Sequence, residues 1–242
     1  MAKKETKSNE QDIVSEEEEK TTKEPSLKEP KGAGLRFIKS KGACRICRRL
    51  GVKLFLKGEK CLSSKCPLIK RPYAPGQHGQ KKTKLSDYGK HLMEKQKLAK
   101  IYGLKDNQIR NLIKKASQSQ ENTEEIIIQL LERRLDNVVY RLGWALSRRQ
   151  ARKLTLAGFF YVNGKKVDRP FYLVKPKDEI SLAKRFLESK VFNEQISHYS
   201  KEAEIPAWLE RKKNQARVTR FPHLEEVQVN IRLPLVIEFY KK

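Results

Sequence analysis

Four cysteines in two closely spaced pairs are the residues of this chain best suited to a defined chemistry. Cys44 and Cys47 enclose two residues, Cys61 and Cys66 enclose four, and thirteen residues separate the pairs. Two short loops of this kind let four thiolates converge on one ion at about 2.3 Å, which completes a tetrahedral zinc site and leaves no position for water. We therefore expect one structural zinc ion with these four cysteines as ligands, and no catalytic metal.

Other uses of the cysteines are less consistent with their spacing. Incidental buried cysteines or a redox pair would not require two short loops, and nothing in the sequence indicates the electron transfer expected of an iron–sulfur cluster. Positive neighbours should favour the thiolate form of the ligands. These neighbours are Arg45, Arg48, Arg49, Lys60 and Lys65.

The overall charge predicts a polyanionic partner. The 242 residues include 54 Lys and Arg against 29 Asp and Glu, a formal net charge of +25. Such a charge repels itself unless a polyanion neutralises it. The sequence contains no apolar run of the roughly 20 residues that a membrane-spanning helix needs, and it begins without a secretory signal. We expect a cytoplasmic protein that binds nucleic acid and not a membrane.

The positive charge is concentrated in two segments. Residues 1–30 carry six Lys and nine acidic residues, and this polar composition predicts a disordered acidic tail. Residues 31–100 have a net charge of +17, and residues 131–190 have a net charge of +9. Local excesses of this size are expected of a binding surface for phosphate.

The loop KRPYAPGQHG (70–79) has the residue types of an RNA-binding arm. Two prolines and two glycines predict an irregular, extended backbone. Aromatic and imidazole rings can stack on bases, and the cations can meet phosphates. An ordinary solvated loop remains the alternative. The candidate RNA-binding residues here are Arg71, Tyr73, Gln77, His78, Lys81, Lys82 and Lys84.

A helix over 131–143 is predicted to have an apolar face and a basic face. The apolar stripe comprises Leu131, Leu135, Val138, Val139 and Leu142, and the opposite side carries Arg133, Arg134, Asn137 and Arg141. One face should pack against the protein. The other should offer guanidinium groups to RNA.

A second helix should follow, with Ser147 as N-cap, Gln150 at the capping-box position and Gly158 as the stop. The helix dipole disfavours cations in its first turn, so basic residues there suggest a phosphate site. Asn163-Gly164 then predicts a hairpin turn, with further strands at 171–174 and 179–182. The candidate RNA-binding residues of this segment are Arg148, Arg149, Arg152, Lys153, Lys165 and Lys166.

The coarse organisation is α+β and mainly helical. We expect a metal-bound loop region at 42–80 and helices from about 86 to 141, with breaks near Gly103 and around 116–123. Pro206, Pro222 and Pro234 predict short strands and loops in the C-terminal segment, and VIEFY (236–240) is expected to be a final strand.

Several long strings resemble the family of small-subunit ribosomal protein four, over about residues 31–242. They are CRICRRLG (44–51), RPYAPGQHG (71–79), SDYGKHLMEKQKLAKIYGL (86–104), ERRLDNVVYRLG (132–143) and SRRQARKL (147–154). The resemblance implies a zinc-binding and helical lobe at 31–130 after the tail, the RNA-binding module of that family at 131–190, and a C-terminal segment at 191–242 that packs back on the helical lobe.

The same resemblance implies a structural constituent of the small ribosomal subunit. Such a protein binds small-subunit rRNA early and nucleates assembly, contacts neighbouring ribosomal proteins, lies where mRNA enters the ribosome and influences translational accuracy. The module also occurs in RNA-modifying enzymes, so a non-ribosomal RNA-binding or RNA-modifying protein is the alternative. The chain has no phosphate-binding glycine loop and its four histidines are scattered. We therefore expect no enzyme and no small-molecule substrate.

Overall fold

The computed structural model describes residues 42–81, 84–190, 192–227 and 229–241. These residues belong to one compact unit. The expected acidic tail at 1–30 and the candidate RNA-binding residue Lys82 lie outside the described residues.

Three short helices form the N-terminal region, where the sequence predicted mainly loops. They are α1 (Ala43–Leu50), α2 (Glu59–Leu62) and α3 (Pro67–Lys70). Gly51 ends α1 in the left-handed conformation, with φ of 68°, which glycine adopts without steric cost. Leu50, Leu54 and Leu56 are buried, so this region contributes its own apolar contacts to the core.

Three helices follow, with breaks at the predicted places. α4 (Asp87–Tyr102) is capped by the Ser86 hydroxyl and ends at Gly103, which has φ of 62°. α5 (Asp106–Ser117) and α6 (Thr123–Glu132) are separated by a turn at 118–122, and Asn122 caps α6. The breaks near Gly103 and around 116–123 are therefore confirmed.

The single helix predicted over 131–143 is wrong, because the chain breaks at Arg133 and Arg134 between α6 and α7 (Leu135–Arg141). The backbone N–H of Leu135 donates to the carbonyl of Tyr172 at 2.8 Å, and Arg134 forms an isolated bridge with Leu173. This bridge replaces the strand predicted at 171–174. The predicted apolar stripe is confirmed, since all five of its residues are buried.

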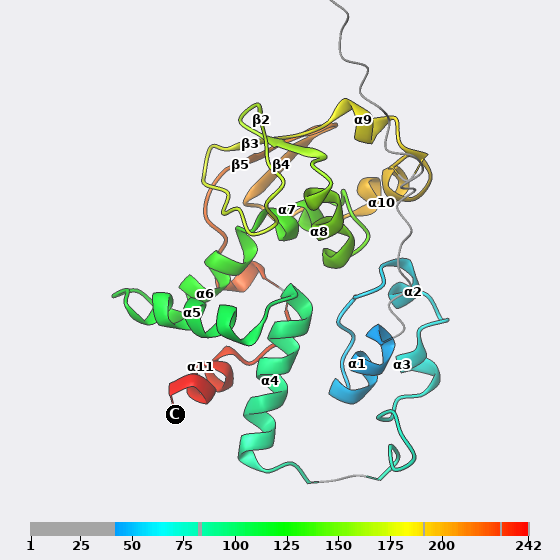
Figure 1. The fold of residues 1–242 in the computed structure, drawn as a ribbon, viewed down its shortest axis with the longest axis vertical. Helices are drawn as coiled ribbons and strands as arrows, with labels where there is room; N and C mark the ends of the chain where they lie inside the picture. Colours follow the sequence, from blue (N-terminus) through cyan, green and yellow to red (C-terminus); the bar gives the residue numbers. More distant parts are fainter. Residues whose placement is uncertain (1–41, 82–83, 191, 228, 242) are drawn as a thin grey trace, which may run out of the picture. The chain divides into compact units, whose positions relative to one another are not determined.

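Five antiparallel strands form one sheet in the order β2-β1-β3-β5-β4. The strands are β1 (Phe160–Val162), β2 (Lys165–Lys166), β3 (Glu179–Leu182), β4 (Leu209–Lys212) and β5 (Gln215–Val218). Asn163 and Gly164 have φ of 50° and 76°, which confirms the predicted hairpin turn. Trp144, in the turn between α7 and α8 (Arg148–Leu156), stacks on Phe160 of β1 with 6.2 Å between ring centroids. Figure 1 shows α7 and α8 beside the sheet.

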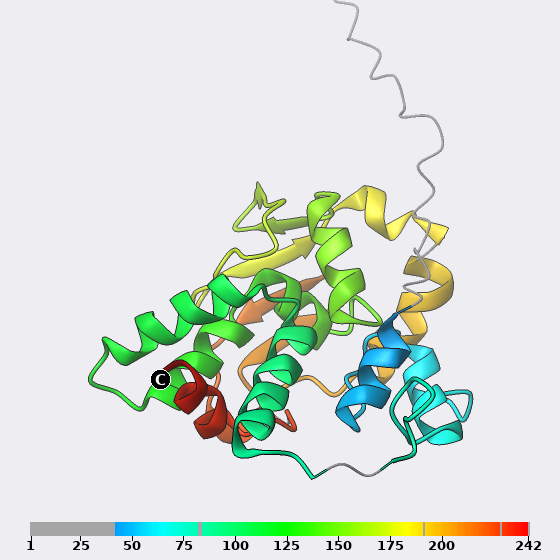
Figure 2. The same cartoon turned by 60° about the horizontal axis from the view of Figure 1, so that its bottom comes forward.

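The strand predicted at VIEFY is wrong, because these residues lie in α11 (Leu233–Lys241). Leu233, Val236 and Ile237 are buried, a spacing that suits one face of a helix rather than alternate positions of a strand. α11 packs against α4, and Figures 1 and 2 show the two helices side by side. Further short helices are α9 (Lys184–Leu187), a π-helical turn (Phe192–Ile196), α10 (Ser197–Glu202) and a 3-10 turn (Leu224–Glu226).

Gly143 follows α7 with φ of 73° and packs closely on the segment after α10. A Cβ atom at Gly143 would lie 2.6 Å from the Cβ of Ala203, whereas a Cβ at Gly164 would meet nothing within 4 Å. We expect Gly143→Ala to lower the free energy of unfolding by about 2–4 kcal/mol, because overpacking adds to the cost of positive φ. Gly164→Ala should lower the free energy of unfolding by about 1 kcal/mol, because only the cost of positive φ applies there.

Urea unfolding monitored by circular dichroism would measure both variants. Equal losses of stability in the two variants would contradict the close packing at Gly143.

Candidate functional site

The four cysteines of the predicted metal site line one small pocket. Cys44 and Cys47 lie on α1, Cys61 lies in α2, and Cys66 directly precedes α3. All four side chains face the pocket together with Leu56. Cys47, Cys61 and Cys66 are buried, Cys44 is half-buried, and all four are free thiols. The tertiary structure thus brings together the two pairs that the sequence separates by thirteen residues.

The donor set and its enclosure fit a zinc ion, although the thiols are not arranged around one. Within the described residues, no group of three or more His, Cys, Asp or Glu has the geometry of a metal site. Four sulfurs in one buried pocket are nevertheless a donor set that zinc prefers. The backbone N–H of Lys57 also donates to Sγ of Cys61 at 3.4 Å, and such a bond favours the thiolate form.

Burial raises the pKa of the Cys47 and Cys61 thiols, and the neighbouring thiols raise it further. No Lys or Arg side chain is among the main causes of these shifts, so the expected effect of the positive neighbours on the thiolate form stays a prediction. Arg45, Arg49, Lys60 and Lys65 are exposed to solvent, where water screens their charge. A bound cation would have to displace the thiol protons.

A second feature of the N-terminal region is a hollow lined by Arg45, Arg48, Arg71 and Tyr73. Arg48 Nε donates to the carbonyl of Tyr73 at 2.9 Å, and its guanidinium lies 5.0 Å from the centre of the Tyr73 ring. Arg48 therefore fixes the loop after α3. Arg45 and Arg71 are exposed beside it, with their guanidinium groups available for phosphate.

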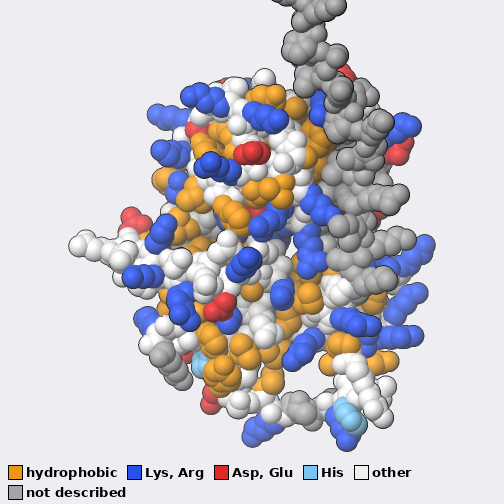
Figure 3. Space-filling view, in the orientation of Figure 1, with side chains coloured by type: hydrophobic (Ala, Val, Ile, Leu, Met, Phe, Trp, Pro, Cys, Tyr) orange, Lys and Arg blue, Asp and Glu red, His pale blue; other side chains and the backbone are white. Residues whose placement is uncertain are grey.

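The rest of the predicted basic arm is exposed. Gln77, His78, Lys81 and Lys84 are all open to solvent. The turn itself is tight, because a Cβ atom at Gly79 would lie 1.9 Å from the carbonyl oxygen of Ala74. Figure 3 shows Lys and Arg side chains spread over the face drawn there, with few acidic side chains among them.

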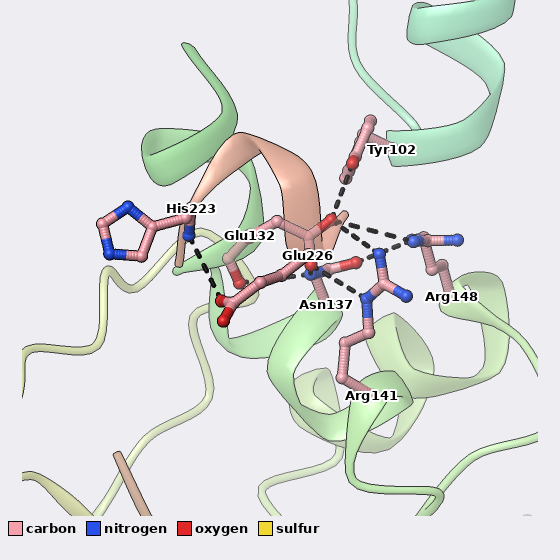
Figure 4. Close-up of polar contacts among 7 residues, drawn as sticks. All are labelled: Tyr102, Glu132, Asn137, Arg141, Arg148, His223 and Glu226. Carbon is pink, nitrogen blue, oxygen red and sulfur yellow. Dashed lines mark hydrogen bonds and ion pairs between the residues drawn. The ribbon is translucent and has the colours of Figure 1, made fainter. Parts of the chain in front are cut away.

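A fully buried carboxylate, Glu132, lies at the centre of a polar cluster (Figure 4). Oε1 accepts a hydrogen bond from the Tyr102 hydroxyl at 2.7 Å, and Oε2 accepts from Asn137 Nδ2 at 2.7 Å. Arg141 donates from Nε at 2.9 Å and from Nη2 at 3.1 Å. Nη2 of Arg148 lies 3.9 Å away. The carboxylate thus joins residues from α4, α6, α7 and α8.

The charges of this cluster determine its ionisation. Burial alone would raise the pKa of Glu132, but Arg141 and Arg148 outweigh burial and the pKa lies below its ordinary value. Burial and the nearby carboxylate both raise the pKa of Tyr102, so its hydroxyl remains a donor. Glu132 is therefore ionised inside the protein, where a lone charge would be costly but a hydrogen-bonded pair is tolerated.

Arg148 is held on several sides. Its Nε donates to Asn137 Oδ1 at 2.6 Å, and its guanidinium lies 5.0 Å from the ring centre of Tyr102 and 4.5 Å from that of Tyr140. The side chain retains 14% of its exposure. At the start of α8 the Ser147 hydroxyl accepts from Gln150 N at 3.3 Å, so the predicted N-cap is confirmed. The Gln150 side chain bonds Leu146 N instead of completing the capping box.

The expectation that Arg134 offers its guanidinium to RNA is wrong, because the side chain is 4% exposed. Arg134 pairs with Asp136 at 2.6 Å and lies over the ring of Phe171, 4.6 Å from its centre. Arg152 lies 4.5 Å from the centre of the same ring and donates to the carbonyl of Gly103 at 3.0 Å. Arg133, which is half-buried, donates to the carbonyl of Val174.

The remaining candidates of the module stay accessible. Arg149 and Lys153 are half-buried on α8, and Lys165 and Lys166 are exposed on β2. The stem of Lys166 lies across Gly158, since a Cβ atom there would be 2.2 Å from Lys166 Cε. The structure thus separates predicted basic residues that are exposed, such as Lys165 and Lys166, from residues whose side chains bind other parts of the protein, such as Arg134.

Sequence reasoning missed Glu132, Tyr102 and Asn137. A signal for Glu132 was present, because it lies four residues after the buried Ile128 and directly after the buried Leu131. An acidic residue at a core position of a helix needs a positive partner. The sequence did not reveal which of the nearby arginines would supply it.

Comparisons with known proteins agree with this arrangement. Residues 39–132 match the family described as ribosomal protein S4/S9 N-terminal domain, and residues 133–180 match the S4 domain. The small ribosomal subunit protein uS4 of Dictyoglomus thermophilum is 49% identical over 201 residues, which are 82% of this chain and 96% of the relative. The uS4 proteins of Thermotoga maritima and Thermodesulfovibrio yellowstonii are 47% and 45% identical, with the same coverage.

The chain belongs to the uS4 family. The uS4 N-terminal domain covers the cysteine pocket, the basic arm and helices α4 to α6. The S4 domain covers α7, α8 and strands β1 and β2, and it ends inside β3. Glu132 is the last residue of the first domain and binds Asn137, Arg141 and Arg148 of the second. No helix in the described part of this uS4 protein is long and apolar enough to cross a membrane.

We expect Glu132→Gln to lower the free energy of unfolding at neutral pH by about 3–5 kcal/mol, because the change leaves Arg141 buried without a charged partner. Glu121→Gln, at an exposed position, should change stability by less than about 0.5 kcal/mol. Urea unfolding measures both differences.

The difference should also depend on pH. The folded-state pKa of Glu132 lies below its unfolded value. The Glu132 carboxylate therefore contributes to the free energy of unfolding above its unfolded pKa of about 4.3. This contribution is lost as pH falls through the pKa of the folded state. The stability of the wild type should approach that of Glu132→Gln in acid. A difference that stays constant from neutral pH into acid would contradict the assignment of an ionised Glu132.

Proposed function

We propose that this protein binds small-subunit rRNA through the exposed basic residues of the N-terminal region and β2, together with the half-buried Lys153 of α8. Membership of the uS4 family supports the coarse function, a structural role in the small subunit of the cytoplasmic ribosome. The net charge of +25 supports a polyanionic partner. The observation that carries the proposal is the separation of the basic residues into a buried, paired set and an exposed set that remains available for phosphate.

The exposed set has the chemistry of backbone recognition. Arg45 and Arg71 lie beside one hollow, and Lys165 and Lys166 lie at the hairpin. Arginine and lysine on such surfaces hold phosphates by charge and hydrogen bonds without reading bases. The fold of the RNA rather than its sequence would then determine where the protein binds.

Further partners follow from the family. The proposed contacts are neighbouring ribosomal proteins of the small subunit and mRNA where it enters the ribosome. An effect on translational accuracy would follow from the contact with mRNA. The proposed role is structural rather than enzymatic. No observation favours the alternative of an RNA-modifying enzyme that carries the same module.

We also propose one structural zinc ion held by Cys44, Cys47, Cys61 and Cys66. The shared pocket and the four-sulfur donor set support it. The ion would supply folding free energy to the N-terminal region, because it links α1, α2 and the start of α3. It would also fix the loop that α3 leads into, where Arg48, Arg71 and Tyr73 lie.

Charge reversal at exposed arginines tests the RNA interface without disturbing the Glu132 cluster. We expect Arg45→Glu with Arg71→Glu to lower the affinity for small-subunit rRNA by about tenfold or more at moderate salt, and to reduce the slope of log K against log salt by about two. Filter binding over a salt series gives both quantities. The control is Lys114→Glu with Lys115→Glu, which makes the same change of charge at exposed positions of α5.

Equal effects of the two double variants would show that only net charge matters and would remove this hollow from the interface. Charge reversal at Arg148 would be a poor test, because Arg148 also holds Asn137 and two aromatic rings.

Metal content tests the zinc proposal. We expect one zinc per chain by native mass spectrometry, and Cys47→Ser should lose the ion. Hydrogen exchange should then increase over residues 42–81 and remain unchanged over 133–180, because a structural zinc stabilises its own region. The control is Ser64→Ala at an exposed position between Cys61 and Cys66. A metal-free wild type with protected residues 42–81 would contradict the proposal.

A further inference from the structure

A cavity of about 280 Å³ lies between the loop after α1, the end of α7 and the start of α8, and its chemistry differs from that of an open basic surface. It is lined by three cations and three aromatic residues, among others. These are Lys53, Arg141, Arg148, Phe55, Tyr140 and Tyr199. Its lining contains no Asp or Glu. A positive cavity with aromatic walls suits a ligand that combines an anion with a flat ring.

The cations of this cavity are oriented before any ligand arrives. Glu132 and Asn137 hold Arg141 and Arg148 from the protein interior, yet the two side chains keep 18% and 14% of their exposure. Lys53 forms no hydrogen bond or ion pair within the described part of the chain. Because Glu132 neutralises one of the three charges, the cavity retains an excess of positive charge. Preoriented donors bind an anion with a smaller entropic cost.

The aromatic residues supply the other half of the site. Tyr140 and Tyr199 share a hydrogen bond between their hydroxyls, and burial raises the pKa of Tyr199 to about 12. Phe55 is 40% exposed and has φ of 50°, a conformation that costs a non-glycine residue free energy and is concentrated at functional sites. An exposed aromatic ring at the edge of a positive cavity can stack on a base.

The walls of the cavity are closely packed. A Cβ atom at Gly58 would lie 2.7 Å from the Cβ of Leu146 and 2.9 Å from its carbonyl oxygen. Only glycine fits there, so the loop that carries Lys53 and Phe55 is held directly against the segment that precedes α8. The cavity is therefore a built feature of the fold and not a gap between loosely placed loops.

We propose that this cavity binds a single nucleotide, with its phosphate at Lys53, Arg141 and Arg148 and its base against Phe55. The inference deepens the proposed rRNA binding, on which it rests. The volume is near the lower end of small-ligand pockets, about 300–1,000 Å³, which suits one nucleotide rather than a stacked pair. An unstacked nucleotide of the rRNA and a free mononucleotide share this chemistry, and the experiment distinguishes them.

Ultraviolet crosslinking of the full chain to small-subunit rRNA locates the contact. We expect a nucleotide adduct on Phe55, Tyr140 or Tyr199. In filter binding, Lys53→Glu should lower the affinity for rRNA about tenfold more than Lys114→Glu, which makes the same charge change on α5. Phe55→Asn should lower the affinity about fivefold or more, because it removes the ring while asparagine tolerates positive φ.

Adenosine monophosphate serves as the free-nucleotide probe. Amide shifts at Lys53 and Tyr199 upon its addition, without adducts from rRNA in the cavity, would assign the site to a free nucleotide. Adducts in the cavity, together with a loss of rRNA affinity in Lys53→Glu that Lys114→Glu does not show, would assign the site to rRNA. The inference fails if rRNA binds, the two lysine variants lower the affinity equally, no adduct forms in the cavity and adenosine monophosphate causes no amide shifts. The proposed function would still stand in that case. Failure of the wild type to bind rRNA would overturn the proposed function, and the mononucleotide titration would then decide the cavity separately.

Discussion

The buried carboxylate of Glu132 is the interaction on which the arrangement of the helices depends. An ionised group inside a protein is tolerated only when charged partners and hydrogen bonds surround it. Glu132 finds these partners on three other helices, through Tyr102 of α4, Arg141 of α7 and the start of α8 at Arg148. A packing that kept Glu132 buried but moved these partners away would leave its charge unpaired. The cluster therefore favours this arrangement at the boundary between the uS4 N-terminal domain and the S4 domain.

This cluster also explains why the basic residues of the chain are not equivalent. Arg48, Arg134 and Arg148 use their donors on carbonyl, carboxylate and amide groups of the protein. Arg45 and Arg71 are exposed and retain a positive field that only an external polyanion can neutralise. The paired arginines hold parts of the protein together, and the side chains of the exposed ones face solvent. A count of arginines in the sequence cannot separate these roles, because both kinds occur in the same short segments.

The N-terminal region connects the proposed metal site with the cavity. The loop from α1 to α2 carries Lys53 and Phe55 and leads to Cys61, which lines the cysteine pocket. A zinc ion would therefore fix one end of the loop that forms the cavity wall, while Gly58 fixes its middle against Leu146. The helices of this region are short, with α2 and α3 of four residues each, and helices of that length need tertiary contacts or a metal to persist.

The sequence by itself determined the features that depend on local chemistry. Gly103 as a helix stop, Ser147 as an N-cap and Asn163-Gly164 as a hairpin turn follow from backbone preferences that act over a few residues, and the apolar stripe from Leu131 to Leu142 follows from helical periodicity. Only the tertiary structure decided what depends on distant partners. The chain breaks at Arg134 because the segment at Tyr172 and Leu173 offers hydrogen bonds there. VIEFY becomes helical because α4 presents a surface for its apolar face. Arg134 and Arg148 become structural because Asp136 and Glu132 are buried beside them, and burial is a property of the folded chain that no local pattern contains.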